Sequence, residues 1–108
     1  MKTVSRRRKK TLNSVSGLRL KFFATYRDIT RCNEIEIPAP SDVWELLGLL
    51  GRRYGDPIKE KLFTPDGEGI GQDAIVLVNG RNVAHLDGKE TPLSETDIVS
   101  IFPMVAGG

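Results

Sequence analysis

The pattern of hydrophobic and polar positions becomes regular at residue 18, where it alternates with a period of two. One face of this segment carries the apolar side chains Leu18, Leu20, Phe22 and Ala24. Strict alternation is typical of a strand with one buried face. After a turn-rich stretch at 26–33, alternation returns over residues 34–37 and stops at Pro38. The sequence therefore predicts a β-hairpin built from these two strands.

The next segment has helical spacing. Its apolar side chains recur three and four positions apart, at Val43, Leu46, Leu47, Leu50 and Tyr54. Ser41 offers an N-cap oxygen and Asp42 places a negative charge in the first turn. Arg52 and Arg53 complement the negative end of the helix dipole, and Gly55 can adopt the positive φ of a helix stop. We expect an amphipathic helix over residues 42–54.

Three further strands are predicted after this helix. Residues 74–78 form an apolar run, followed by Asn79-Gly80, the strongest short signal for a tight hairpin. Residues 82–85 are the expected return strand, and residues 97–102 the last strand, ended by Pro103. Residues 58–63 are predicted to form at most a helical turn. The expected order is ββαβββ.

This order predicts an α+β fold of the β-grasp (ubiquitin-like) type, with a mixed sheet and one main helix packed on one face. The last strand would lie parallel beside the first, because the helix provides the crossover that such a pair needs. The inward positions are expected to be Leu20, Phe22, Ile35, Ile37, Val43, Leu46, Leu47, Leu50, Ile75, Leu77, Val99 and Ile101.

The same alternation places two aromatic residues, Phe23 and Phe102, on neighbouring strands of the face that points away from the helix. Exposed aromatic side chains on an open sheet face are a candidate partner surface. The alternative is that a loop covers them.

Charge divides the chain into a basic arm and an acidic domain. Residues 1–16 contain six basic residues and no acidic one, whereas residues 17–108 contain ten basic and fourteen acidic residues. With so few apolar side chains, residues 1–16 are expected to be a basic flexible arm. Residues 17–103 would form the single β-grasp domain and residues 104–108 an extended C-terminal tail. An arm that contacts RNA or an anionic surface is the weaker hypothesis, so nucleic acid is not an expected partner.

Composition argues against membrane insertion, secretion and metal binding. The longest apolar runs fall far short of the roughly 18 residues that a spanning helix needs, and the arm lacks the apolar core of a secretory signal. Cys32 is the single cysteine, which fits a reducing cytoplasm. The acidic residues Asp66, Glu68 and Asp73 lack the spacing of a calcium loop, and His85 stands alone. We expect a cytoplasmic protein with no bound metal or cofactor.

The end of the chain carries the most informative pattern, Phe102-Pro103-Met104-Val105-Ala106-Gly107-Gly108. Pro103 stops the strand, and uncharged residues lead to the terminal carboxylate. Such a tail can enter a narrow channel, because glycine allows a close backbone approach that a Cβ would block. The alternative is that the glycines belong to an ordinary disordered end. We expect Gly107 and Gly108 to carry the function.

Five segments resemble the small subunit of molybdopterin synthase: LKFFA (20–24), LVNGR (77–81), DGKETPL (87–93), DIV (97–99) and FPMVAGG (102–108). That family consists of ubiquitin-like sulfur carriers, and thiamine-pathway sulfur carriers and archaeal small modifiers are its relatives. The resemblance covers about residues 18–108. Met104 departs from it, standing where a second proline is common, and residues 55–73 are longer than in the shortest members.

The resemblance implies a chemistry at the C-terminus. An adenylating (E1-like) activating enzyme would use ATP to adenylate Gly108, and a sulfur donor protein would then supply persulfide sulfur. The carried group would be a C-terminal thiocarboxylate, whose sulfur is nucleophilic at neutral pH as a carboxylate is not.

The large subunit of molybdopterin synthase would receive the tail, and the sulfur would build the dithiolene that binds molybdenum or tungsten. The partner-binding residues are expected to be Phe23, Phe102, Pro103, Met104, Val105 and Ala106. The chain would be a non-catalytic subunit with no turnover of its own, because the partner supplies the pocket and the acid or base groups.

Two other functions stay open at this point. A protein modifier would use the same adenylation and then be joined through Gly108 to lysine amines on target proteins. A β-grasp binding module would leave the tail inert. The sequence does not separate the carrier from the modifier, although the aromatic pair and Pro103 favour the synthase subunit.

Overall fold

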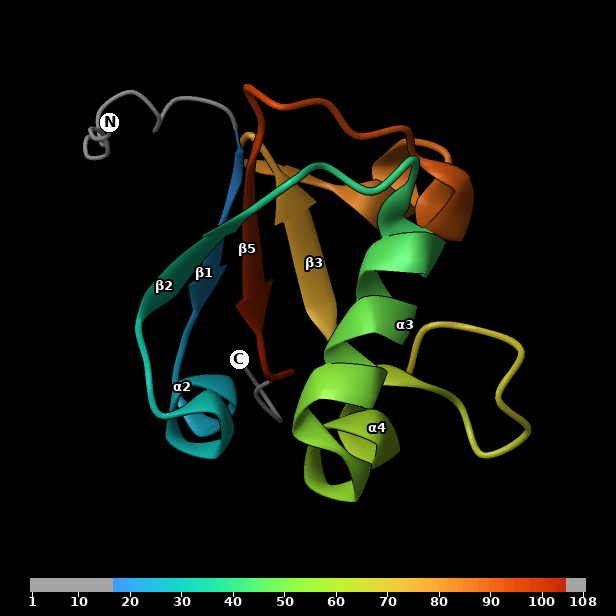
Figure 1. The fold of residues 1–108 in the computed structure, drawn as a ribbon. Helices are drawn as coiled ribbons and strands as arrows, with labels where there is room; N and C mark the ends of the chain where they lie inside the picture. The colour runs from blue at the N-terminus through green and yellow to red at the C-terminus, as the bar shows by residue number, and fades with distance from the viewer. Residues whose placement is uncertain (1–16, 105–108) are drawn as a thin grey trace, which may run out of the picture.

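The computed structural model describes residues 17–104 (Figure 1). The predicted arm, residues 1–16, and residues 105–108 of the tail lie outside the described residues. Within residues 17–104 the strands form one sheet in the order β2-β1-β5-β3-β4. Their bounds are β1 (Leu18–Phe22), β2 (Glu34–Ile37), β3 (Ile75–Val78), β4 (Arg81–Asn82) and β5 (Ile98–Phe102).

The pairing of the strands confirms the β-grasp prediction. β1 is antiparallel to β2, with Leu20 opposite Ile35, and parallel to β5, with Leu20 opposite Val99. β3 is antiparallel to both β5 and β4. The β3–β4 turn has positive φ at Asn79 (52°) and Gly80 (85°), as the Asn-Gly pair predicts. β5 therefore lies in the centre of the sheet, between β1 and β3.

One main helix, α3 (Val43–Tyr54), lies across one face of the sheet (Figure 1). Its N-cap is Asp42, one residue later than predicted, because Asp42 Oδ1 accepts a hydrogen bond from the Glu45 backbone N–H (2.9 Å). The backbone N–H and hydroxyl of Ser41 donate to the Glu45 carboxylate instead (2.6 and 2.7 Å), which lowers the pKa of Glu45. Gly55, at φ 81°, ends the helix as predicted.

Four shorter helices complete the described domain. They are α2 (Thr25–Thr30), α4 (Asp56–Leu62) and the 3-10 turns η1 (Val83–His85) and η2 (Gly88–Glu90). The predicted helical turn at 58–63 is thus a full helix, and it buries Ile58 and Leu62. The prediction of a return strand at 82–85 is wrong. β4 has only two residues, Arg81 and Asn82, and the Asn82 side chain then caps η1 by accepting a hydrogen bond from the Ala84 N–H.

The hydrophobic core lies between α3 and the sheet and confirms most of the predicted inward positions. The prediction is wrong for Ile75 and Leu77, which are half-buried, whereas Val76 and Val78 are buried. Their register explains the difference: Val76 pairs with Ile101 and Val78 with Val99, both of which face the core. Ile35 is only partly buried.

The end of β1 also differs from the predicted alternation. The strand stops at Phe22, and Ala24, expected on the inward face, is exposed with φ 53° and ψ −123°. This conformation is strained for a residue with a Cβ and costs about 1–3 kcal/mol. The Tyr26 N–H donates to the Phe23 carbonyl across this corner (3.1 Å). The turn-rich stretch therefore contains α2, which the sequence did not predict.

No helix between residues 17 and 104 has the length and hydrophobicity to cross a membrane.

Candidate functional site

The candidate site is built around two stacked aromatic rings at the end of β5. Phe102 is the last residue of β5, and Phe23 follows the last residue of β1, which runs parallel beside it. Their ring centroids are 4.3 Å apart with 4° between the planes. The Phe23 N–H donates to the Ile101 carbonyl (3.1 Å), which continues the ladder one residue beyond β1. Both rings are partly exposed.

Strand register extends this pair into an apolar surface, here called the outer-face patch. Phe102 pairs with Ile75 and Ser100 pairs with Leu77, while Ile98 alternates with the buried Val99. Side chains on the face opposite α3 are therefore apolar along β5 and β3 except at Ser100. The patch consists of the partly exposed residues Phe23, Ile75, Leu77, Ile98 and Phe102.

The other half of the outer face is charged. Arg19 and Lys21 on β1 lie beside Glu34 and Glu36 on β2. Arg19 Nε donates to Glu34 Oε2 at 2.8 Å, and this contact lowers the pKa of the Glu34 carboxyl. The pair is exposed on both sides, so it contributes little stability. The outer face thus offers a partner an apolar strip bordered by mixed charge.

The tail begins beside a hollow in the surface. Met104 is 56% exposed and stands at the edge of a cavity of about 420 Å³. The rest of the lining comes from the segment before β3, from β3 itself and from the region of η1 and η2, and includes Ile70, Ala74, Ile75 and Val83.

The structure brings together four of the predicted site residues: Phe23, Phe102, Pro103 and Met104 lie at one end of the sheet. The other predicted residues, Val105, Ala106, Gly107 and Gly108, lie outside the described residues. Ile75 and Leu77 belong to the site but were predicted to face the core. The Asn79-Gly80 turn fixes the β3–β4 pairing, but the apolar run at 74–78 carries no polar residue that would mark its outer face.

A protein-family model described as the ThiS family matches residues 20–108. The chain belongs to the ThiS family. Small archaeal modifier protein 3 of Haloferax volcanii is 41% identical over 93 residues, which cover 84% of this chain and 98% of that protein. A protein of Archaeoglobus fulgidus named as a sulfur carrier is 41% identical over 76 residues, covering 69% of this chain and 84% of that protein.

Solved structures of ThiS-like proteins share the fold. A Pyrococcus furiosus protein named as subunit 1 of a molybdopterin converting factor superimposes with a TM-score of 0.65 and 31% identity, covering 83% of this chain and 99% of that one. Two further structures of this fold are complexes of two proteins, from Amycolatopsis orientalis and Helicobacter pylori, with TM-scores of 0.70 and 0.55. The chain is therefore a ubiquitin-like β-grasp protein of the sulfur carrier and small modifier group.

A buried tyrosine ties α2 to the segment before β3. Tyr26 on α2 is completely buried, and its hydroxyl donates to the Asp73 carbonyl at 2.7 Å. Burial raises the pKa of the Tyr26 phenol well above its ordinary value, so the phenol stays protonated and keeps donating. This bond ties α2, which starts just after Phe23, to the segment before β3. Sequence analysis missed Tyr26 because it lies in a stretch predicted to be a turn.

The other reactive side chains do not belong to the group formed by Phe23, Phe102, Pro103 and Met104. Cys32 is half-buried, with its thiol 3.6 Å from the Thr30 hydroxyl, and His85 is exposed on η1. Asp66 accepts hydrogen bonds from the Thr64 hydroxyl and the Glu68 N–H, which close the loop after α4 and lower the pKa of Asp66. Between residues 17 and 104, His, Cys, Asp and Glu side chains form no group of three that could hold a metal ion.

Proposed function

We propose that this chain is a sulfur carrier that acts as the small subunit of a molybdopterin synthase. Its terminal Gly108 would bear a thiocarboxylate that donates sulfur for the dithiolene of the molybdenum or tungsten cofactor. The observation that carries the proposal is the stacked Phe23–Phe102 pair at the root of an uncharged Gly-Gly tail. Membership of the ThiS family and the fold shared with the Pyrococcus furiosus protein support it.

The proposed loading takes place at the terminal carboxylate. Gly108 attacks the α-phosphorus of ATP on an adenylating enzyme, and pyrophosphate leaves. The terminal sulfur of a donor protein's persulfide then displaces AMP from the acyl adenylate. A second thiol takes over the inner sulfur as a disulfide and releases the thiocarboxylate. Adenylation is needed because a carboxylate is a poor electrophile, whereas its adenylate carries AMP as a good leaving group. The product replaces a weak oxygen nucleophile by a soft sulfur nucleophile.

The outer-face patch gives this chemistry its partner surface. A tail of four residues beyond Met104 spans at most about 14 Å when extended. A partner must therefore dock against the domain itself before Gly108 can reach a recessed catalytic centre. The partly exposed residues Phe23 and Phe102 are suited to that contact, because aromatic anchors dominate protein interfaces. The acid and base groups would come from the large subunit, so the carrier alone should show no turnover. We place this ATP-dependent chemistry in the cytoplasm.

A second candidate function is protein modification. The Haloferax volcanii protein that is 41% identical to this chain is named a small modifier, and it covers most of the chain. In this alternative the Gly108 adenylate reacts with lysine amines of target proteins, and an amide bond replaces the acyl phosphate. Both functions share the activating enzyme and the tail, so the product of the reaction separates them.

The test is the intact mass of the full chain after incubation with the adenylating enzyme of the same organism, ATP and a persulfide donor. Replacement of one oxygen by sulfur, a gain of about 16 Da, supports the carrier, because it reports thiocarboxylate formation. Isopeptide-linked conjugates without that gain support the modifier. An unchanged mass and no conjugates would reject both. A reaction without ATP is the control.

A further inference from the structure

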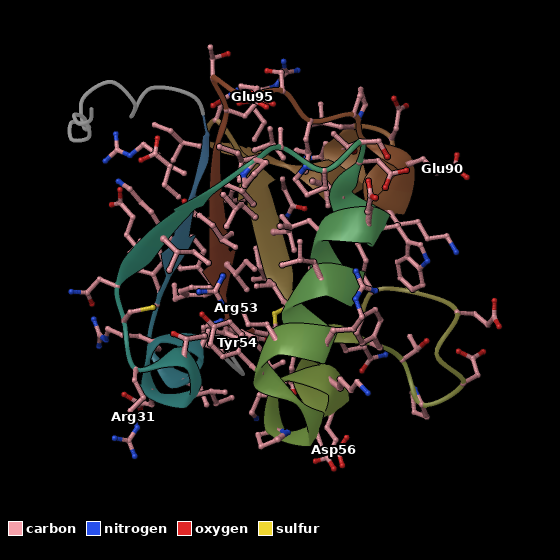
Figure 2. All side chains as sticks on the ribbon, viewed as in Figure 1. Arg31, Arg53, Tyr54, Asp56, Glu90 and Glu95 are labelled. Carbon is pink, nitrogen blue, oxygen red and sulfur yellow. The ribbon has the colours of Figure 1, made fainter. Side chains whose placement is uncertain are left out.

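Four arginines line the end of the domain from which the tail leaves, and they form what we call the arginine edge: Arg27, Arg31, Arg52 and Arg53. Arg27 lies on α2 and Arg31 caps its C-terminus, with φ 65° and ψ 26°. Arg52 and Arg53 lie in the last turn of α3. All four side chains are exposed. In Figure 2, Arg31 lies at the lower left beside α2 and Arg53 lies nearer the centre, both below Glu90 and Glu95.

Tyr54, the last residue of α3, connects the end of this helix to β1 and to Cys32, which follows α2. The Arg53 guanidinium carbon is 5.6 Å from the centroid of the Tyr54 ring, and that ring packs edge-on against Phe22 of β1. Burial raises the pKa of Tyr54, and the thiol of Cys32, which follows Arg31, adds a smaller increase. Tyr54 thus lies between β1 and the end of α3, with Arg53 over its ring.

These arginines have no acidic partner in the described domain. The single ion pair within residues 17–104 joins Arg19 and Glu34, so no carboxylate oxygen lies within 4.0 Å of the arginine edge. The acidic side chains on these elements are Asp28 on α2 and Glu45 on α3, and Asp56 and Glu60 lie on α4, which follows α3. The pKa of Glu45 is lowered mainly by its hydrogen bonds from Ser41 and further by the charge of Arg52. The helix dipole favours cations at the C-terminal ends of α2 and α3. The dipole accounts for the positive charge of these residues. It does not occupy their guanidinium groups, which can bind carboxylates in a bidentate manner.

The opposite end of the domain is acidic. Residues 85–97, which include η2 and the approach to β5, carry Asp87, Glu90, Glu95 and Asp97 against a single base, Lys89. Figure 2 shows Glu90 and Glu95 at the end away from Arg31, Arg53 and Asp56. β5 runs from the acidic end to the arginine edge, since it ends at Phe102 where α2 begins beside it. The direction from the acidic end to the arginine edge is therefore the direction in which β5 runs toward its C-terminal end.

We propose that the arginine edge docks on an acidic protein surface around the opening into which the adenylating enzyme takes the tail. This inference rests on the proposed function and names the chemistry of that partner surface. An acidic surface attracts the arginine edge and repels the acidic end, so the domain approaches with Gly108 first. Charges arranged in this way raise the association rate, and salt suppresses the effect.

A protein surface fits the edge better than a nucleic acid does. Asp28, Asp56 and Glu60 lie among the arginines, and such interspersed carboxylates oppose the continuous phosphate backbone of RNA. Single acidic side chains on a protein can instead be placed opposite single arginines.

The test uses the full chain and the purified adenylating enzyme of the same organism, with association rates measured by stopped-flow fluorescence. Arg31→Glu and Arg53→Glu should each slow association about 3- to 10-fold at about 20 mM salt, and less than about twofold at about 500 mM. The matched control is Arg81→Glu, an exposed arginine on β4 at the acidic end. It changes the net charge equally and should leave the rate within about twofold. Thermal unfolding checks that each variant is folded.

Four outcomes decide the proposal. Slower, salt-dependent association of both edge variants but not of the control supports it. If Arg53→Glu and Arg81→Glu slow association equally, only the net charge of the chain matters, and the proposal is overturned. Unchanged rates with normal sulfur loading would overturn it and leave the proposed function standing, whereas no loading of the wild-type chain defeats that function by itself. If the wild-type chain binds a single-stranded RNA of about 20 nucleotides more tightly than it binds the adenylating enzyme, and the edge variants lose that binding, the edge is assigned to nucleic acid instead.

Discussion

The rings of Phe23 and Phe102 stack 4.3 Å apart and within 4° of parallel, across the parallel pair formed by β1 and β5. Neither residue belongs to the core, and both lie on the face away from α3. This stack lies outside the core, at the point where the chain leaves the sheet. It also presents two flat apolar rings to a partner.

Replacing either ring by a methyl group should weaken binding to the large subunit. Phe23→Ala and Phe102→Ala are each expected to cost more than about 1 kcal/mol of binding free energy, because buried aromatic anchors carry much of an interface's affinity. Isothermal titration calorimetry measures this directly. Trp44→Ala, on the helix side of the domain, is the control and should leave the affinity unchanged. Wild-type affinity in both phenylalanine variants would remove the outer-face patch from the interface.

Deleting Gly108 should abolish sulfur loading with little change in thermal stability. The reacting carbonyl is lost from its position, while residues 17–104 keep all their contacts. Intact mass reports the loading and circular dichroism the melting temperature. Deleting residues 1–16 is the control at the other end of the chain and should leave loading intact. A chain without Gly108 that still gains sulfur would disprove the assigned role.

Tyr26→Phe should destabilise the domain by about 1–2 kcal/mol, because the Asp73 carbonyl loses its buried donor. Burial raises the folded-state pKa of Tyr26 above the unfolded value near 10. The protonated phenol therefore stabilises the fold fully below about pH 10, and this contribution is lost as the pH rises further. Urea unfolding of the wild type should show that loss, and Tyr26→Phe should flatten it. Parallel pH profiles would contradict the prediction.

Two glycines in the loop after α4 should respond differently to alanine. A Cβ on Gly71 would lie 2.6 Å from the Lys61 carbonyl oxygen and 3.0 Å from that of Phe63, so backbone must move. Gly71→Ala should cost about 1–3 kcal/mol of unfolding free energy. A Cβ on Gly69 would meet only the Thr64 side chain at 3.7 Å, and Gly69→Ala should change stability by less than about 0.5 kcal/mol. Equal losses in chemical denaturation would show that the close approach is absent.

The strained corner after Phe23 gives a fifth prediction. Ala24→Gly should leave the unfolding free energy unchanged or higher, because glycine adopts φ 53° without a steric penalty. Ala24→Val should lower it by more than about 1 kcal/mol, since a β-branched side chain resists positive φ. A stable valine variant, measured by thermal unfolding, would mean that the corner relaxes to another backbone conformation.

Regular alternation and helix spacing were enough to predict most of the fold. β1, β2 and α3 have polar residues between their apolar ones, so each pattern identifies both the element and its buried face. The run at 74–78 has no such contrast, and only its pairing with β5 decides that Val76 rather than Ile75 faces the core. α2 is too short for a periodic signal, and its start depends on a backbone conformation at Ala24 that alanine rarely adopts.

The candidate site was predictable where it depends on strand alternation and not where it depends on contacts distant in sequence. The alternation along two parallel strands was enough to predict that Phe23 and Phe102 share the face opposite the helix on neighbouring strands. Tyr26 bonds to Asp73, 47 residues away, and nothing local signals that contact. The arginine edge requires that the ends of α2 and α3 meet beside Tyr54, which the helix spacing alone does not specify.

The central place of β5 also determines how the domain bears tension. A partner that draws the tail along the strand axis would load the hydrogen bonds to β1 and to β3 together, in shear rather than one after another. An edge strand would have been held on one side only. A pull on the last residues would thus be shared by two neighbouring strands, and the domain could stay folded through repeated cycles of binding and release.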